Sequence, residues 1–349
     1  MFDIKKWVRP HLLTLKPYSS ARDEYTGKEG VFLDANENSI GSVGGQELNR
    51  YPDPYQHAIK ERLTLLKGVE MRQIFLGNGS DEAIDLLIRA FCEPKEDNII
   101  ILPPTYGMYQ VSANIHAVGI KEVLLDENFD LRVEATLAAV DRHTKMIFVC
   151  SPNNPSGNSL TIQKIEQLLR SFEGIVVIDE AYIDFSSQPS FVRRLAEFPN
   201  LVVLQTFSKA WGLAAVRMGI AFAAEPIIEL LNKIKPPYNI NLLTQKAIIH
   251  ALHHCDDKEK MVAELLWQRR LLAQRLLEVP YVEKVFPSDA NFLLVKMRNP
   301  KKVYQELVNQ LVIVRDRSSV PRCEGCLRIT VGTDRENEIL IESMKKITV

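Results

Sequence analysis

Short apolar runs alternate with helical patterns through the middle of the chain. The runs are rich in β-branched residues and carry almost no polar position, as 175–178 illustrates. Between them, apolar residues recur at helical spacing, as in 81–91 and 162–172. Strands buried on both faces of a sheet have this continuous apolar character. The alternation therefore predicts an α/β fold, a mostly parallel mixed sheet flanked by helices. The expected strands are 72–76, 98–102, 146–150, 175–178 and 201–204.

The helix expected over 81–91 has polar residues at its start. We expect Ser80 to cap this helix, and Asp81 and Glu82 fall in its first turn. Backbone N–H groups in a first helical turn have no partner within the helix and form a site for anions. We therefore expect the segment 79–81 to hold a negatively charged group.

The pattern changes after Pro236 and Pro237, where long helical segments take over from the alternation. Two strand-like segments lie among them, which predicts a smaller α+β domain at the C-terminal end. The first thirty residues show little periodicity and predict an arm. We divide the chain into an arm (1–30), a large domain (31–245) and a small domain (246–349). The expected C-terminal helices are 242–253, 258–277, 303–311 and 337–347, and the strands are 291–296 and 327–331.

The composition is that of an ordinary globular protein. The 349 residues include 43 basic and 44 acidic side chains, for a net charge of −1. A nucleic-acid partner would require a concentrated basic face, so we expect none. No apolar run reaches the length of a membrane span, and the first ten residues lack the apolar core of a signal peptide. We therefore expect a cytoplasmic protein that does not engage a membrane.

The five cysteines are odd in number and scattered, which argues against a disulfide framework. Cys323 and Cys326 form a lone C-x-x-C. Zinc would require a second pair of ligands, and none follows before the chain ends. We therefore expect no metal site.

Polar residues follow three of the expected strands. Asn154 comes after 146–150, Asp179 ends the run at 175–178, and Lys209 comes after 201–204. Each has an ordinary interpretation, as a turn residue, a helix cap and a surface lysine respectively. However, a carboxylate at the end of a buried strand is costly unless it is paired. Ligands also gather at the carboxyl ends of strands in open α/β sheets.

Five segments, taken in order, resemble the pyridoxal-phosphate (PLP) aminotransferases of fold type I. The spacing from Ser208 and Lys209 to Arg217 is similar to the S-K-x(7)-R signature of that family. Asn154 belongs to an N-P-S-G run that is similar to the family's N-P-T-G, with the hydroxyl retained. The matching segments are 151–157, 179–182, 206–209, Arg217 and 326–330.

The resemblance implies a role for each residue toward PLP. Lys209 would form the Schiff base and move a proton, and Asp179 would hold the ring nitrogen in its protonated form. Tyr182 and Asn154 would donate to the phenolic oxygen of the ring. Tyr106 would stack on the face of the ring. The cofactor phosphate would be held by the remaining residues, Ser80, Asp81, Ser208, Arg217 and, from a second subunit, Tyr51. The last of these implies a homodimer with shared active sites.

The resemblance narrows to the histidinol-phosphate aminotransferases and runs nearly end to end. In that family, an arginine at the position of Arg328 is expected to hold the substrate phosphate, helped by Arg315 and by Tyr18 from the partner chain. Strand alternation places Arg328 opposite its apolar neighbours, on a face toward solvent or toward a cleft. The segments that carry the resemblance are 15–18, 33–38, 51–54, 104–109, 314–316 and 326–332.

One segment departs from the family pattern. Ser39 and Ile40 stand where the family often has Pro and Tyr, which affects recognition of the imidazole ring and leaves the PLP assignment intact.

The activity implied by the resemblance is a reversible, two-stage amino transfer in L-histidine biosynthesis. Lys209 would first hold PLP. Glutamate would take the place of Lys209 on the cofactor, leave its amino group there and depart as 2-oxoglutarate. Imidazole-acetol phosphate would then receive this amino group and become L-histidinol phosphate. Alternatives that share the cofactor residues are an aromatic-amino-acid aminotransferase and a threonine-phosphate decarboxylase. A non-catalytic effector domain of a transcription regulator would carry an added DNA-binding domain, for which the arm before Val31 leaves no room.

Overall fold

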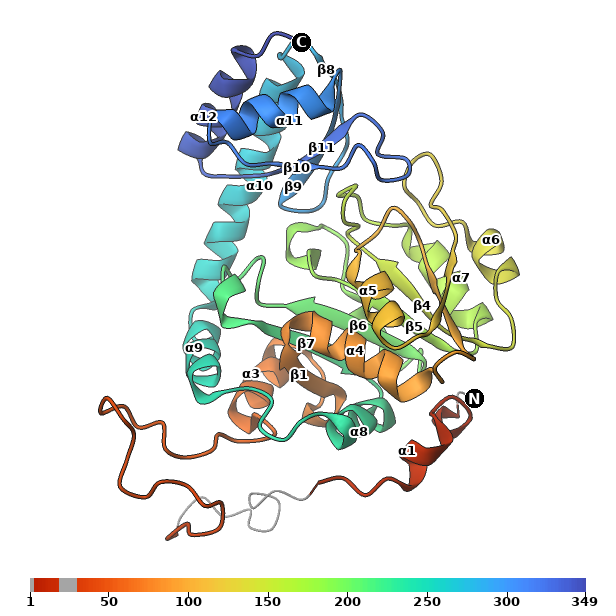
Figure 1. Ribbon diagram of the computed structural model, residues 1–349, viewed down its shortest axis with the longest axis vertical. Helices are drawn as coiled ribbons and strands as arrows, with labels where there is room; N and C mark the ends of the chain where they lie inside the picture. The colour runs from red at the N-terminus through yellow and green to blue at the C-terminus, as the bar shows by residue number, and fades with distance from the viewer. Residues whose placement is uncertain (1–2, 19–29) are drawn as a thin grey trace.

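The computed structural model describes residues 3–18 and 30–349, which form two domains (Figure 1). Parts of the predicted arm, residues 1–2 and 19–29, lie outside the described residues. The larger domain is built on a seven-stranded sheet and the smaller one on a four-stranded sheet. Helix α10 (Cys255–Leu277) runs from the large domain into the small one. The predicted α/β architecture with a smaller C-terminal α+β unit is confirmed.

The large sheet is mixed and mostly parallel, as expected. Strand β7 pairs antiparallel with both of its neighbours, and every other pairing of the described sheet is parallel. The carboxyl ends of the parallel strands therefore meet at one edge of the sheet. In spatial order the strands are β1 (Ile74–Asn78), β7 (Met218–Ala223), β6 (Leu201–Thr206), β5 (Ile175–Asp179), β4 (Thr144–Cys150), β2 (Asn98–Ile101) and β3 (Gly119–Glu122).

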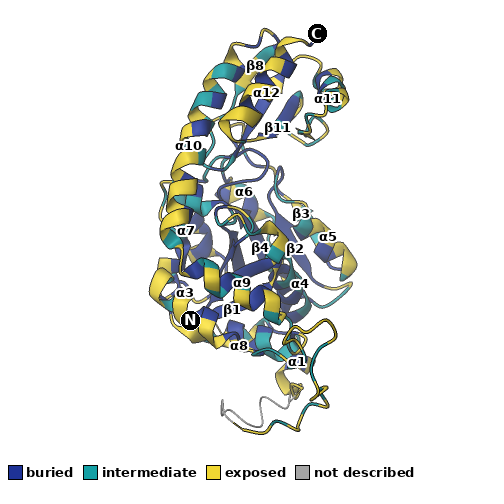
Figure 2. Cartoon of the chain, turned by 90° about the vertical axis from the view of Figure 1, so that its left-hand side faces the viewer, coloured by how far each residue is buried: buried dark blue, intermediate teal, exposed yellow. Residues whose placement is uncertain are grey.

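Helices cover both faces of this sheet, which is why its strands read as continuous apolar runs. In β5, Val176 and Ile178 belong to one core cluster, whereas Ile175 and Val177 belong to the other. Figure 2 shows the buried strands enclosed by helices with exposed outer faces. The first cluster includes residues of α3 (His57–Lys67), α6 (Val133–Ala138), α7 (Ile162–Ser171) and α9 (Leu242–Leu252), and the second includes residues of α4 (Gly79–Phe91), α5 (Met108–Ile115) and α8 (Glu225–Ile234).

The small sheet is antiparallel, and three helices cover one of its faces. Leu327 and Ile329 pack with Leu276 and Ile341 into a separate core. Arg328 lies between them in the strand, so its side chain leaves from the opposite face. The elements are β10 (Arg315–Asp316), β11 (Cys326–Thr330), β9 (Phe292–Met297) and β8 (Val282–Val285), covered by α10, α11 (Pro300–Asn309) and α12 (Asp334–Lys345).

Several expected boundaries differ from the structure. Ser80 was expected to cap the helix over 81–91, and this is wrong: α4 already begins at Gly79, after Asn78, so Ser80 lies in its first turn. The N–H of Gly79 donates to the Arg217 carbonyl over 2.9 Å, which connects the start of α4 to the residue that directly precedes β7. The predicted boundary at 245/246 falls inside α9. Ile248 and Leu252 of that helix belong to the large-domain core. The residue bounds predicted for the arm and the two domains remain a proposal.

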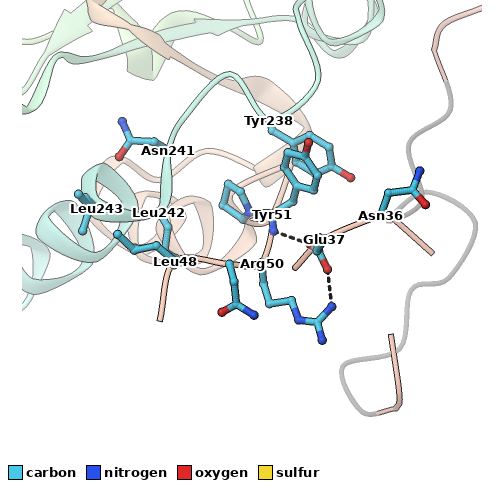
Figure 3. Close-up of a pocket in the computed structure, with 12 residues that line it drawn as sticks. Asn36, Glu37, Leu48, Arg50, Tyr51, Tyr238, Asn241, Leu242 and Leu243 are labelled. Atoms are coloured by element: carbon cyan, nitrogen blue, oxygen red, sulfur yellow. Dashed lines mark hydrogen bonds and ion pairs between the residues drawn. The ribbon is translucent and has the colours of Figure 1, made fainter. Parts of the chain in front are cut away.

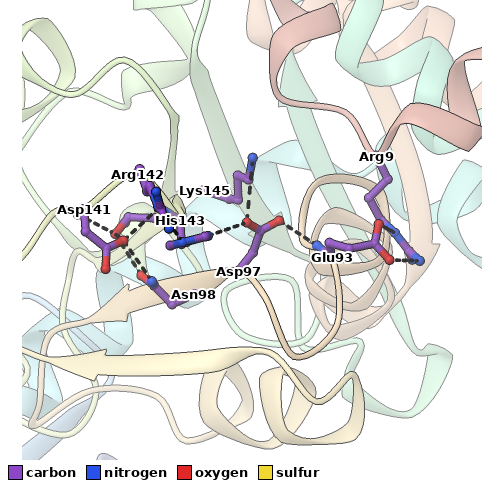
Figure 4. Close-up of polar contacts among 9 residues, drawn as sticks. Arg9, Glu93, Asp97, Asn98, Asp141, Arg142, His143 and Lys145 are labelled. Atoms are coloured by element: carbon purple, nitrogen blue, oxygen red, sulfur yellow. Dashed lines mark hydrogen bonds and ion pairs between the residues drawn. The ribbon is translucent and has the colours of Figure 1, made fainter.

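The N-terminal segment is tied to the large domain far from the small one. Arg9 pairs with Glu93 over 3.1 Å, and the N–H of Glu93 donates to Asp97 over 2.7 Å (Figure 4). Asp97 in turn lies 3.8 Å from the amine of Lys145. This network fixes the start of the arm. The short helices not yet named are η1 (Ile4–Lys6), α1 (Pro10–Thr14), η2 (Met71–Gln73), η3 (Ile183–Phe185), η4 (Phe191–Arg194) and η5 (Ala214–Val216).

Candidate active site

A cleft opens at the carboxyl ends of β4, β5 and β6. It brings together most of the residues predicted for the cofactor, from segments that lie far apart in the sequence. A second, outer cleft adjoins it beneath the small domain and shares Tyr106, Asn154, Tyr182 and Lys209 with it; Arg315 and Arg328 line this outer part. The predicted residues lining the inner cleft are Ser80, Asp81, Tyr106, Asn154, Asp179, Tyr182, Ser208, Lys209 and Arg217.

Asp179 is the buried carboxylate at the floor of the inner cleft. It ends β5 and only 3% of its surface is exposed. The Tyr109 hydroxyl donates to its Oδ2 over 2.7 Å, and the Ala181 N–H donates to its Oδ1 over 3.0 Å. Burial raises the pKa of Asp179, and these two hydrogen bonds act against that rise. The sequence did not single out Tyr109, because its role depends on how α5 packs against the sheet.

Lys209 follows β6 and faces the same cleft. Its amine lies 5.6 Å from the centre of the Tyr182 ring. The residue as a whole is exposed at the open mouth of the cleft. Loss of hydration around the amine lowers the pKa of Lys209, and the nearby Arg328 guanidinium lowers it further. Asp179 acts in the opposite direction. A lysine in these surroundings is more readily neutral than a surface lysine.

The opposite end of the cleft is suited to an anion. Gly79 has φ +71°, and a Cβ on it would lie 2.7 Å from Nη2 of Arg217. Arg217 therefore lies directly over the first turn of α4, where backbone N–H groups have no partner within the helix. Arg217 Nη1 lies 3.5 Å from the Ser208 hydroxyl, which accepts from Thr206 over 3.0 Å. These groups form a compact set of donors with one fixed positive charge.

Close packing holds this anion end in place from below. Gly219 of β7 lies beneath the start of α4, and a Cβ on it would lie 2.1 Å from the backbone nitrogen of Ser80. Only glycine permits this approach. The antiparallel strand β7 was not predicted, so this support for the helix start was missed as well.

The aromatic wall is formed by Tyr106. Its hydroxyl donates to Asp81 over 3.1 Å, and its ring meets Tyr109 edge-on at 5.6 Å. Burial, followed by the Asp81 charge, raises the pKa of Tyr106. The ring is therefore a neutral, fixed surface along the cleft.

Asn154 joins the inner cleft to the outer one. Arg328 Nη1 donates to Asn154 Oδ1 over 2.5 Å, across the gap between the two domains. The amide nitrogen of Asn154 is thereby left to donate into the inner cleft. Burial raises the pKa of the neighbouring Tyr182, and the Arg328 charge opposes that rise. The sequence allowed Arg328 to face either solvent or a cleft. In the structure, Arg328 faces the cleft.

Tyr51 and Tyr18 do not reach this cleft within the chain. Tyr51 stacks on Tyr238 with ring centres 4.5 Å apart, in a separate surface pocket (Figure 3). The backbone N–H of Tyr51 donates to Glu37 over 2.6 Å, and Glu37 also pairs with Arg50. Half of the Tyr51 surface is exposed, and 73% of Tyr18. Both tyrosines are therefore presented outward.

Two further expectations concern metals and membranes. Within residues 3–18 and 30–349, no three histidine, cysteine or acidic side chains are grouped so that they would hold a metal ion. Cys323 and Cys326 are both buried and free. In the same part of the chain, no helix has the length and apolar character needed to cross a membrane.

Comparisons with known proteins agree on one family. Residues 24–344 match the family described as aminotransferase class I and II. A histidinol-phosphate aminotransferase of Cytophaga hutchinsonii is 56% identical over 344 residues, covering 99% of each chain. The enzyme of the same name from Parabacteroides distasonis is 55% identical over 347 residues, again covering 99% of each chain.

Solved structures share the fold at lower identity. The histidinol-phosphate aminotransferase of Clostridium acetobutylicum superimposes with a TM-score of 0.79 at 24% identity, covering 85% of this chain and 90% of that one. The Sinorhizobium meliloti protein, solved with pyridoxal-5'-phosphate, gives 0.79 at 22% identity and covers 89% of each chain.

Proposed function

The chain belongs to the histidinol-phosphate aminotransferase family within the class I and II aminotransferases, and we propose that its cleft transfers an amino group between L-histidinol phosphate and 2-oxoglutarate. It is a PLP-dependent enzyme. The observation that carries the substrate assignment is the position of Arg328. This residue binds Asn154 of the inner cleft and faces Arg315 across the strand pair β10–β11. The guanidinium groups therefore place positive charge next to the residues of the inner cleft, where they can hold a substrate phosphate.

The residues of the inner cleft fit PLP at both of its ends. Asp179 is a buried carboxylate whose two hydrogen bonds leave acceptor positions open for a ring N–H. At the other end, the first turn of α4, Ser208 and Arg217 match the needs of a phosphate. Tyr106 supplies a flat wall between them. When bound, PLP supplies a sink for the electron pair released at the amine-bearing carbon.

Lys209 is the residue that we assign to covalent attachment and proton movement. Its lowered pKa favours the neutral amine, which is the form that attacks an aldehyde and that accepts a proton. Once released from the cofactor, its amine would carry the proton between the amine-bearing carbon of the substrate and the cofactor carbon. Asp179 would hold the ring nitrogen in its protonated form at the opposite end of the ring, and Tyr182 and Asn154 would donate toward the phenolic oxygen.

The test is a single-turnover experiment with the purified, cofactor-loaded enzyme. L-histidinol phosphate, L-phenylalanine and O-phospho-L-threonine are added separately, and the cofactor absorbance is followed over time. Rapid conversion by L-histidinol phosphate alone is the expected result. Preference for phenylalanine would instead assign an aromatic aminotransferase, and release of carbon dioxide from O-phospho-L-threonine would assign a decarboxylase.

We also propose that two copies of the chain share their active sites. Tyr51 and Tyr18 point outward within one chain, which fits residues that complete the cleft of a second copy. In that arrangement, Lys209→Ala and Tyr51→Ala enzymes would each be nearly inactive. Mixing them under conditions of subunit exchange should restore about a quarter of the wild-type activity, because half of the dimers then hold one intact site. No recovery on mixing would contradict shared sites.

A cytoplasmic location remains our expectation, and cell fractionation tests it.

A further inference from the structure

Three arginine side chains of the small domain, not two, line the outer cleft. Arg315 lies directly opposite Arg328 in the antiparallel pairing of β10 and β11. The Arg317 N–H donates to the Cys326 carbonyl over 3.0 Å, which continues the same ladder by one more pair. Because side chains alternate along a strand, Arg315 and Arg317 leave from the face that also carries Arg328.

Of the two residues on that strand, Arg317 lies deeper. Arg315 is exposed, whereas Arg317 is half-buried. The Arg317 charge also reaches the inner cleft, since it opposes the rise that burial causes in the pKa of Tyr182. Of Arg315 and Arg317, Arg317 therefore lies nearer to the inner cleft.

The group carries more positive charge than its surroundings balance. No ion pair involves Arg315, Arg317 or Arg328 within the described part of the chain. Burial lowers the pKa of Arg317, and the Arg328 and Arg315 charges lower it further. Lys209 adds a further amine to the same cleft, and Glu122 is the one carboxylate among the described residues that line it.

Like charges placed opposite each other across a strand pair are destabilising. A cluster of this kind is therefore best explained by an anion that it holds. One guanidinium fork matches a carboxylate, whereas three donors from different directions match the three oxygens and two charges of a phosphate monoester.

We propose that Arg317 is a specificity-determining residue that completes a three-arginine site for the dianionic phosphate of the amino donor. This inference rests on the proposed function, because it assumes a donor that carries a phosphate. Under this proposal, Arg317 makes the cleft prefer a phosphate to a carboxylate, although the same cleft must also accept the partner of the reaction that carries a carboxylate.

The experiment compares two donors that differ only in the phosphate, L-histidinol phosphate and L-histidinol. The apparent Kd of each is measured from single-turnover saturation, and that of glutamate is measured in parallel. The variants are Arg317→Gln, which removes the charge, and Arg317→Lys, which keeps it. Arg335→Gln is the matched control, since this exposed arginine of α12 removes one charge from the same domain outside the cleft.

Arg317→Gln should raise the Kd of L-histidinol phosphate roughly 10- to 100-fold, as expected for the loss of charged hydrogen bonds. The Kd values of L-histidinol and glutamate should change by less than about threefold, and Arg317→Lys should recover part of the loss. Arg335→Gln should match the wild type.

Two outcomes would overturn the claims, and they are distinguishable. Equal losses for L-histidinol phosphate and L-histidinol in Arg317→Gln would mean that Arg317 supports the fold rather than the phosphate. A wild-type enzyme that does not prefer L-histidinol phosphate to L-histidinol would contradict the proposed function itself.

Discussion

The hydroxyl of Tyr109 donates to Oδ2 of Asp179 over 2.7 Å, with both side chains buried beneath the inner cleft. A hydrogen bond to a buried carboxylate stabilises its ionised form, which is the form that pairs with a protonated ring nitrogen. The Tyr109 ring is held in turn by stacking on Phe148 at 4.7 Å. Tyr109 is thus a positioning residue that acts through Asp179.

Replacing Tyr109 with Phe keeps the stacked ring and removes only this donor. The pKa of Asp179 should rise further above its usual range, so the carboxylate holds the cofactor ring less firmly. A hydrogen bond to a charged group contributes about 1.5–3 kcal/mol. The equilibrium Kd of PLP should therefore increase roughly tenfold or more, and the loss should deepen as the pH falls, because protonation of Asp179 then begins at a higher pH.

The matched control for this variant is Tyr281→Phe. Tyr281 is also buried, and its hydroxyl donates to the Met344 carbonyl over 2.8 Å in the small-domain core. Its loss should lower stability without changing cofactor affinity. If Tyr109→Phe behaves in the same way, Tyr109 supports packing only.

Gly219→Ala should damage the anion end of the cleft. The added Cβ would meet the backbone at Ser80 and Gly79, at 2.1 and 2.3 Å, so α4 must shift. Forcing atoms into a packed site typically costs about 1–3 kcal/mol. We expect weaker cofactor retention, measured by dialysis, with a loss of at least about tenfold. Ala221→Gly on the same strand removes a methyl group from the core and should destabilise the protein while leaving retention unchanged. Normal retention in Gly219→Ala would contradict this account of the helix start.

Lys60 predicts a pH dependence of stability that is separate from catalysis. Its side chain is almost fully buried in α3, and burial, together with the Lys235 charge, lowers the pKa of Lys60 to about 8. The unfolded chain, with a pKa near 10.5, binds more protons between these two values. The free energy of unfolding should therefore rise with pH across that window.

The size of this effect follows from the shift. Each pKa unit corresponds to about 1.4 kcal/mol, so the wild type should gain up to about 3 kcal/mol relative to Lys60→Met between pH 8 and pH 10.5. Urea unfolding of the cofactor-free proteins at several pH values measures the difference. A difference in the free energy of unfolding that does not change with pH would contradict a lowered pKa for Lys60.

The strands buried on both faces were the most predictable part of the fold. Each of the five predicted for the large sheet is present, because burial on both sides leaves a continuous apolar signature in the sequence. The edge strand β3 was missed because it is short and carries Lys121 and Glu122. Strand β7 was missed as well, although it is fully buried. Its antiparallel course, and the support that Gly219 gives to α4, follow from pairing that one sequence does not reveal.

The site residues that could be predicted from the sequence are those that end a strand or follow one, each with a single function. Lys209, Asp179 and Asn154 all face the same cleft, as the carboxyl-edge argument predicts. What the sequence could not supply were contacts between elements. Tyr109 supports Asp179 from α5, and Arg317 joins the cleft only through the register of β10 against β11. Alternation along 327–331 left two faces open for Arg328, and the packing of the two domains decided between them.

We assign the covalent attachment of the cofactor to Lys209, and every other role in the cleft depends on this assignment. The direct measurement is treatment of the PLP-loaded enzyme with sodium borohydride, which makes the bond between lysine and cofactor permanent, followed by peptide mass spectrometry. We expect a single phosphopyridoxyl mass on the peptide that contains Lys209, and none in Lys209→Ala. An adduct on another lysine, or the same adduct retained in Lys209→Ala, would contradict it.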